Sequence, residues 1–161
     1  MNKKIIALLV VVALAATGTI FAETGLGLQG GWVVGGGAGA TVTFKVESLP
    51  CVFAVDFGFP GGGISVGGTA DWWIQNPTIS DTWGWYYGVG AAASVTLGSN
   101  FGFGAYGRAL VGTNIYLLDN FLELYVQAAW QPGIAIDTAS DKPIIPVLFA
   151  FPINGGFRVW F

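Results

Sequence analysis

The stretch from Phe121 to Gln131, FLELYVQAAWQ, alternates apolar and polar residues along its length and decides the fold. Every second residue from Leu122 to Trp130 is apolar, and polar residues such as Glu123 and Gln127 stand between them. Successive side chains of a β-strand point to opposite faces, whereas a helix would bring residues three or four apart together. The stretch therefore predicts a strand with one apolar and one polar face.

The same alternation recurs in segments of about ten residues, the length of a tilted membrane strand. Seven further segments carry it: Leu26–Trp32, Ala38–Glu47, Phe53–Phe59, Ile64–Gln75, Trp83–Thr96, Phe101–Val111 and Val147–Phe161. The connections contain Gly, Pro, Asn and Asp, which favour tight turns, and none is long enough for a crossover helix. The sequence predicts an all-β fold, an eight-stranded antiparallel up-and-down β-barrel.

The composition indicates a membrane protein without membrane helices. Among 161 residues, 53% are apolar and 9% are charged, whereas soluble domains contain about 25% charged residues. Outside the N-terminus no apolar run reaches the roughly 20 residues that a membrane helix needs. A soluble enzyme and a helical membrane protein are therefore disfavoured. The net charge of −3 and the lack of a basic patch also exclude nucleic acid as a partner.

Residues 1–22 have the pattern of a secretory signal peptide. Two lysines precede an apolar stretch from Ile5 to Ala16, which is too short to span a bilayer. Cleavage after Ala22 leaves residues 23–161 as one transmembrane β-barrel domain, and cleavage after Ala15 is the alternative. An uncleaved anchor is a second alternative. The segment predicts export.

The apolar face of the predicted strands is large and aromatic, whereas the polar face is rich in Gly, Ala and Ser. A soluble barrel with an apolar lumen would need more charge on its outer face, so bulky residues outside and small ones inside favour a lipid-facing exterior. Tryptophans near strand ends are typical of an aromatic girdle at the headgroup level. The predicted girdle is Trp32, Trp72, Trp83, Trp85, Trp130 and Trp160; ordinary core aromatics are the alternative.

The C-terminus carries a second, independent signal. Counting back from the terminal Phe161, Val159, Phe157 and Ile153 stand third, fifth and ninth. This spacing resembles the β-signal that the outer-membrane barrel-assembly machinery recognises on its clients. We therefore predict insertion into the outer membrane of a diderm bacterium, with the lipid bilayer and that machinery as partners.

Three motifs resemble a family of small spirochaetal outer-membrane β-barrels of unestablished biochemical role. They are Trp85–Gly90 (WYYGVG), Leu122–Val126 (LELYV) leading to Pro132-Gly133, and Ile153–Phe161 (INGGFRVWF). The resemblance covers most of residues 23–161 loosely and the last forty best. It implies an OmpA-like eight-stranded transmembrane domain and supplies no catalytic residues.

Charged residues on the polar face would lie in the lumen. They are Lys45, Glu47, Asp56, Asp71, Arg108, Glu123 and Arg158. Three cations and four anions in a narrow lumen predict a salt-bridge network, because an unpaired charge in a low-dielectric interior costs several kcal/mol. An ion or proton path is the alternative. Eight strands leave a lumen that side chains fill, which favours the network.

The sequence lacks the residues of common catalytic and metal sites. It contains no His and a single cysteine, Cys51, which removes His-dependent hydrolysis and most transition-metal ligands. Asp71 and Glu123 could be imagined as an acid–base pair, but nothing in the sequence brings them to one cleft. We therefore expect no enzymatic activity and no cofactor.

One connection is long enough for a surface epitope, the predicted loop from Asp137 to Pro146 with Asp137, Asp141 and Lys142. The leading functional hypothesis is a non-enzymatic outer-membrane protein with a plugged lumen and a structural or surface-interaction role. A narrow conduit for small or hydrophobic solutes is the alternative. A third hypothesis is binding of a host protein through this loop.

Overall fold

The computed structural model describes residues 24–34, 37–59, 63–98, 101–138 and 144–161. They form ten strands: β1 (Thr24–Val33), β2 (Ala38–Val46), β3 (Cys51–Gly58), β4 (Gly63–Gln75), β5 (Trp83–Gly98), β6 (Gly102–Leu117), β7 (Leu122–Trp130), β8 (Gly133–Asp137), β9 (Ile144–Val147) and β10 (Pro152–Trp160). Within these ranges no helix is long and apolar enough to cross a membrane. The predicted signal peptide lies outside the described residues.

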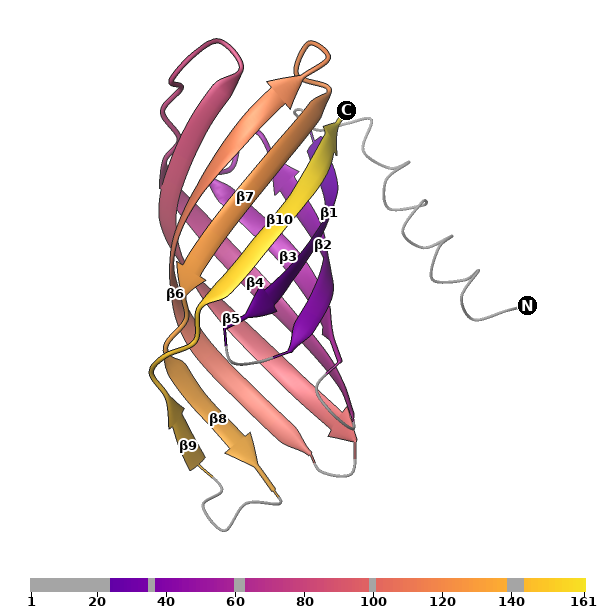
Figure 1. The fold of residues 1–161 in the computed structure, drawn as a ribbon, viewed down its shortest axis with the longest axis vertical. Coiled ribbons are helices and arrows are strands. Elements are labelled where there is room, and N and C mark those ends of the chain that lie inside the picture. Colours follow the sequence, from indigo (N-terminus) through magenta and orange to yellow (C-terminus); the bar gives the residue numbers. More distant parts are fainter. Residues whose placement is uncertain (1–23, 35–36, 60–62, 99–100, 139–143) are drawn as a thin grey trace, which may run out of the picture.

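Eight of these strands close into an antiparallel barrel (Figure 1). Strands β1 to β5 follow one another around the wall, β1 pairs with β10, and the order continues through β7 and β6 back to β5. Closure leaves the eight barrel strands without an unpaired edge. The predicted fold class, an all-β eight-stranded antiparallel up-and-down barrel, is confirmed.

The hydrogen-bond register gives the barrel its stagger. Starting from Gly31, one path around the wall passes through β2, β3, β4 and β5 to Gly102 on β6. The opposite path passes through β10 and β7 and arrives at Gly112, ten residues further along the same strand. This stagger over eight strands corresponds to a strand tilt of about 40° and a backbone radius of about 8 Å. A lumen this narrow is filled by side chains that point inward.

The predicted loop Asp137–Pro146 is shorter than expected, because Asp137 ends one strand and Ile144–Pro146 belong to the next. Strand β8 ends at Asp137 and β9 begins at Ile144, while Asp141 and Lys142 lie outside the described residues. Strand β6 pairs with β7 through Ala109–Leu117 and with β8 through Gly102–Tyr106. The β8–β9 hairpin therefore continues the wall.

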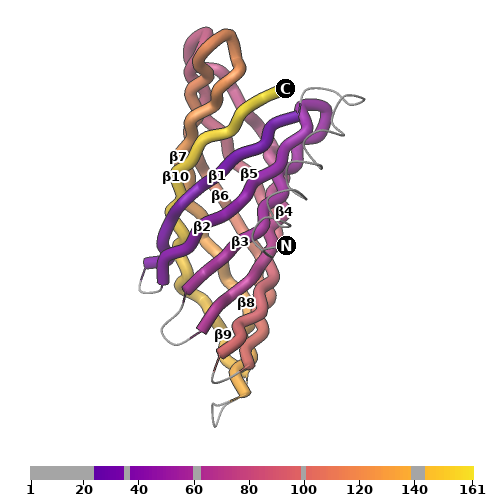
Figure 2. The backbone as a smooth tube through the Cα atoms, turned by 90° about the vertical axis from the view of Figure 1, so that its right-hand side faces the viewer, coloured from indigo at the N-terminus to yellow at the C-terminus, as the bar shows by residue number. Residues whose placement is uncertain are grey.

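The last predicted strand also begins later than expected, because β9 and β10 are separated by residues 148–151. The indole of Trp130 donates to the carbonyl of Leu148, and the Gln131 amide donates to that of Ala150. These bonds hold the connection against the barrel wall. The β8–β9 and β5–β6 hairpins project past the end of β1 and the start of β2, on the side of the barrel opposite the C-terminus (Figures 1 and 2).

The two faces of the barrel strands differ as predicted. Along β7, Glu123, Tyr125 and Gln127 are buried, whereas Leu124 and Val126 between them are exposed. Among the described residues, ten buried side chains are polar or charged and nine, including Pro152, are apolar or aromatic. Large apolar side chains are exposed on every strand of the barrel. The molecule thus has a polar interior and an apolar exterior, the reverse of a water-soluble protein.

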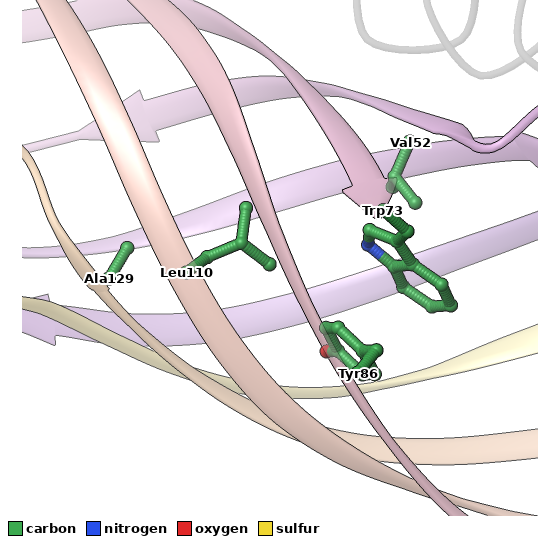
Figure 3. Packing of buried hydrophobic residues seen from close by; sticks show 5 residues of the cluster. All are labelled: Val52, Trp73, Tyr86, Leu110 and Ala129. Atoms are coloured by element: carbon green, nitrogen blue, oxygen red, sulfur yellow. The ribbon is translucent and has the colours of Figure 1, made fainter. Parts of the chain in front are cut away.

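Inside the described lumen, buried apolar and aromatic side chains form one small cluster. Figure 3 shows the buried cluster of Val52, Trp73, Tyr86, Leu110 and Ala129. The rings of Trp73 and Tyr86 stack with centroids 3.9 Å apart and an interplanar angle of 13°. Trp73 faces inward because it follows the outward Trp72 by one residue. These stacked rings occupy the half of the lumen nearer the C-terminus.

Candidate functional site

The most buried charges among the described residues form an ion pair, in the half of the lumen nearer the C-terminus. Arg158 on β10 and Glu123 on β7 are cross-strand neighbours, and Arg158 Nη1 lies 2.5 Å from Glu123 Oε2. Their side chains are 1% and 0% exposed. Asn114 Nδ2 donates to the other carboxylate oxygen at 3.0 Å, and Trp160 Nε1 donates to Oε2 at 3.1 Å. Glu123 is therefore neutralised and hydrogen-bonded on both oxygens.

Lys45 fills the space beside this pair. Its ammonium lies 5.0 Å from the ring centroids of both Trp73 and Trp160, so the cation is held between two aromatic faces. It makes no ion pair with any residue that the structure describes. Lys45, the two indoles and the Arg158–Glu123 pair together block this half of the lumen, and we call these five residues the plug.

A second ion pair lies further along the lumen. Arg108 binds Asp71 through two contacts, Nε to Oδ1 at 2.8 Å and Nη2 to Oδ2 at 3.2 Å. Its Nη1 also donates to Gln131 Oε1. Each of the three guanidinium nitrogens thus makes a hydrogen bond, and the bidentate geometry fixes the orientation of the group.

The seven predicted charges therefore do not form one network. Four of them form two separate ion pairs, and Lys45 and Asp56 belong to neither pair. Asp56 accepts a hydrogen bond from Thr41 Oγ1 at 2.6 Å and forms no ion pair with the predicted cations of the described chain. Glu47 does not belong to the lumen at all, so this part of the prediction is wrong. It is exposed because β2 ends at Val46 and the chain turns there.

Glycines in the wall allow long side chains to meet across three strands. Gly90 on β5 pairs with Asp71 on one side and Arg108 on the other, and the two side chains bond to each other over it. A Cβ at Gly90 would collide with Asp71 Oδ1. We call such a contact a glycine-spanning pair.

Three more glycine-spanning pairs occupy the lumen. Tyr86 OH donates to Gln127 over Gly112 at 3.0 Å, Tyr125 OH donates to Gln29 over Gly156 at 3.0 Å, and Lys45 meets the Trp160 ring over Gly25. Two strands that are separated by a third strand lie about 9 to 10 Å apart. The missing side chain on the middle strand clears the space that these contacts cross.

Beyond the Arg108–Asp71 pair the lumen widens into a cavity of about 320 Å³. Arg108 and Gln131 lie at its base, and the ends of β1 to β5 form its rim. Thr41, Asp56, Ser65, Ser94 and Tyr106 are among the side chains that line it. The lumen is thus divided into a blocked half and a half that can hold a small molecule.

The predicted tryptophan girdle is divided between the two faces of the wall. Trp32, Trp72, Trp83, Trp85 and Trp130 are exposed on the outside, near strand ends. The prediction for Trp160 is wrong, because its side chain is 9% exposed and lies in the lumen. Trp160 is two residues from the inward Arg158 and so shares its face. The predicted assembly residues Ile153, Phe157 and Val159 share the opposite, outward face of β10, and Phe161 follows that strand.

No protein-family model, curated protein or solved structure matches this chain. The resemblance to spirochaetal barrels therefore stays a prediction. In the described part of the chain, no three metal-binding side chains of the His, Cys, Asp and Glu types gather into one site.

Proposed function

We propose that this chain is an outer-membrane β-barrel protein without catalytic activity, with a structural or surface-interaction role and a lumen blocked by side chains. The observation that carries the proposal is the reversed polarity of the barrel, with charges inside and large apolar side chains outside. In water such a surface would drive association, whereas in a bilayer it matches the hydrocarbon. A closed barrel also satisfies every backbone group of the wall within the bilayer.

The plug supports a structural role over transport. Arg158, Glu123 and the two indoles around Lys45 are fixed by direct contacts, so an ion crossing the lumen would have to break a buried pair. Breaking such a pair costs about 3–5 kcal/mol. Both central carboxylates, Asp71 and Glu123, are also occupied by arginines, which supports the absence of acid–base catalysis.

Planar-bilayer conductance of the refolded chain tests this assignment. Folding is established first by the faster gel migration of the unheated barrel compared with the boiled chain. We expect the folded wild type to be silent and the E123A/R158A variant to show stepwise openings, because that variant removes the central ion pair. Stable openings of the wild type would support the alternative, a narrow conduit for small or hydrophobic solutes.

The end of the barrel bearing the β5–β6 and β8–β9 hairpins is the proposed cell-surface end. It carries the cavity and the projecting hairpins, so a host protein would meet these elements first. Export by the N-terminal signal and recognition of Ile153, Phe157, Val159 and Phe161 by the assembly machinery complete the proposal. Fractionation of expressing cells tests it, with recovery in the outer membrane as the expected result and recovery in the soluble fraction as the contrary one.

A further inference from the structure

The cavity described above has a net negative charge. Arg108 supplies its cation, and that guanidinium is already neutralised by Asp71 and bonded to Gln131. Asp56 also lines the cavity, with one carboxylate oxygen bonded to Thr41 and the other unbonded among the described residues. Among the described residues that line the cavity, an anionic ligand would meet the carboxylate of Asp56 and no unpaired cation. The charge of the cavity therefore favours a cationic ligand.

The rest of the lining consists largely of hydrogen-bond acceptors and small residues. Ser65 on β4 and Thr96 on β5 are direct cross-strand neighbours, with Thr69 and Ser94 further along the same wall. These four hydroxyls bond no other residue in the described chain. Their oxygens can accept from N–H donors. The ring of Tyr106 adds an aromatic face, which attracts an organic cation.

We infer that this cavity binds a small organic amine whose ammonium group is received by Asp56 and the hydroxyls around it. The volume of about 320 Å³ lies at the lower limit for ligand sites, so a slim aliphatic amine fits and a folded peptide does not. Glycines and alanines such as Gly39, Gly58 and Ala92 leave room for its carbon chain. A neutral saccharide could use the same hydroxyls, but it would leave the Asp56 carboxylate without a counter-charge.

Calorimetric titration of the full chain, folded in detergent, tests the site with three probes of one carbon skeleton. They are 1,4-diaminobutane, 1,4-butanediol and butanedioate, which are cationic, neutral and anionic. We expect saturable binding of the diamine alone. Saturable binding of the diol with similar affinity would overturn the inference in favour of a polyol site, and absence of diamine binding would overturn it outright.

Two variants separate a specific site from general attraction of amines to an acidic protein. D56N keeps an acceptor for Thr41 and removes the charge, so we expect diamine affinity to fall by roughly tenfold or more. D81N removes an equal charge from the exposed turn at the other end of the barrel and should bind like the wild type. Equal losses in D56N and D81N would show nonspecific attraction and overturn the site.

A third variant covers the case in which D56N fails to fold. Ser94→Leu narrows the cavity and leaves Asp56 in place, and it should also abolish saturable diamine binding. Gel migration of unheated samples establishes that each variant is folded. A folded Ser94→Leu chain that binds the diamine like the wild type would place the ligand outside this cavity and overturn the inference.

Discussion

At the residue scale, glycine sets which side chains can meet inside the barrel. The glycine-spanning pairs join residues two strands apart, and each uses the missing Cβ of the strand between them. Gly90 brings the Asp71 carboxylate and the Arg108 guanidinium together in this way. Some of the 26 glycines of the chain are therefore needed to make room for side-chain contacts in the lumen, and not only to form turns.

Gly90→Ala should destabilise the barrel by about 1–3 kcal/mol, because the added methyl overlaps the Asp71 carboxylate and the Ala70 carbonyl. Gly107→Ala is the matched control on β6. Its added carbon would point outward, and its nearest neighbour would be the Pro132 carbonyl at 4.0 Å. Urea unfolding of both variants in vesicles, followed by tryptophan fluorescence, measures the difference. Equal stabilities would contradict the packing role of Gly90.

The Arg158–Glu123 pair gives a second prediction at this scale. R158M removes the cation and leaves a buried carboxylate, so we expect a loss of about 3–5 kcal/mol in unfolding free energy. The double variant E123Q/R158M removes both charges and should recover most of that loss. E47Q, at an exposed position, serves as the control and should leave stability unchanged. A double variant as unstable as R158M would argue against charge burial as the cause.

At the element scale, strand length decided which predictions succeeded. The long alternating segments, such as Phe121–Gln131, fixed both the strands and their faces, because a period of two over ten residues is unambiguous. The five-residue β8 and four-residue β9 carry too few residues for that pattern, and Pro132 and Pro146 beside and within them favour a loop. Pairing with the long β6, a tertiary effect, makes them strands.

The β8–β9 hairpin should be dispensable for closure of the barrel. Strand β6 pairs with β5 along nearly its whole length, and β9 pairs with β8 and with no other described strand. Gly133 and Val147 are paired, so replacing residues 134–146 by Asn-Gly would close a tight hairpin between them. We expect this variant to keep the fast-migrating folded form on an unheated gel. Loss of that form would make the hairpin part of the folding unit.

At the scale of the whole molecule, the sequence specified which face is polar but not how the polar residues meet. Alternation placed Lys45, Asp71, Arg108, Glu123 and Arg158 inside, and burial of all five confirms this. The pairing of Asp71 with Arg108 and of Glu123 with Arg158 depends on register, because the stagger of ten residues sets which side chains share a level. Register is fixed by turns and by packing around the closed wall, which a single strand's pattern does not contain.

The reversed polarity predicts which tryptophans touch lipid. Trp73 and Trp160 lie in the lumen, whereas five tryptophans face outward near strand ends. A chain in which those five are replaced by Phe should show little fluorescence quenching by brominated lipids in vesicles. The W73F/W160F variant, which keeps the outward five, should be quenched strongly.

The position of the bromines adds a second measurement. Aromatic side chains at strand ends lie near the headgroups, so bromines close to the carbonyl region should quench W73F/W160F more than bromines at the chain ends. Folding of each chain is checked by gel migration before heating. Equal quenching of the chain that keeps only the inward tryptophans and of W73F/W160F would show that the apolar face of the barrel does not contact lipid. That result would overturn the proposed location.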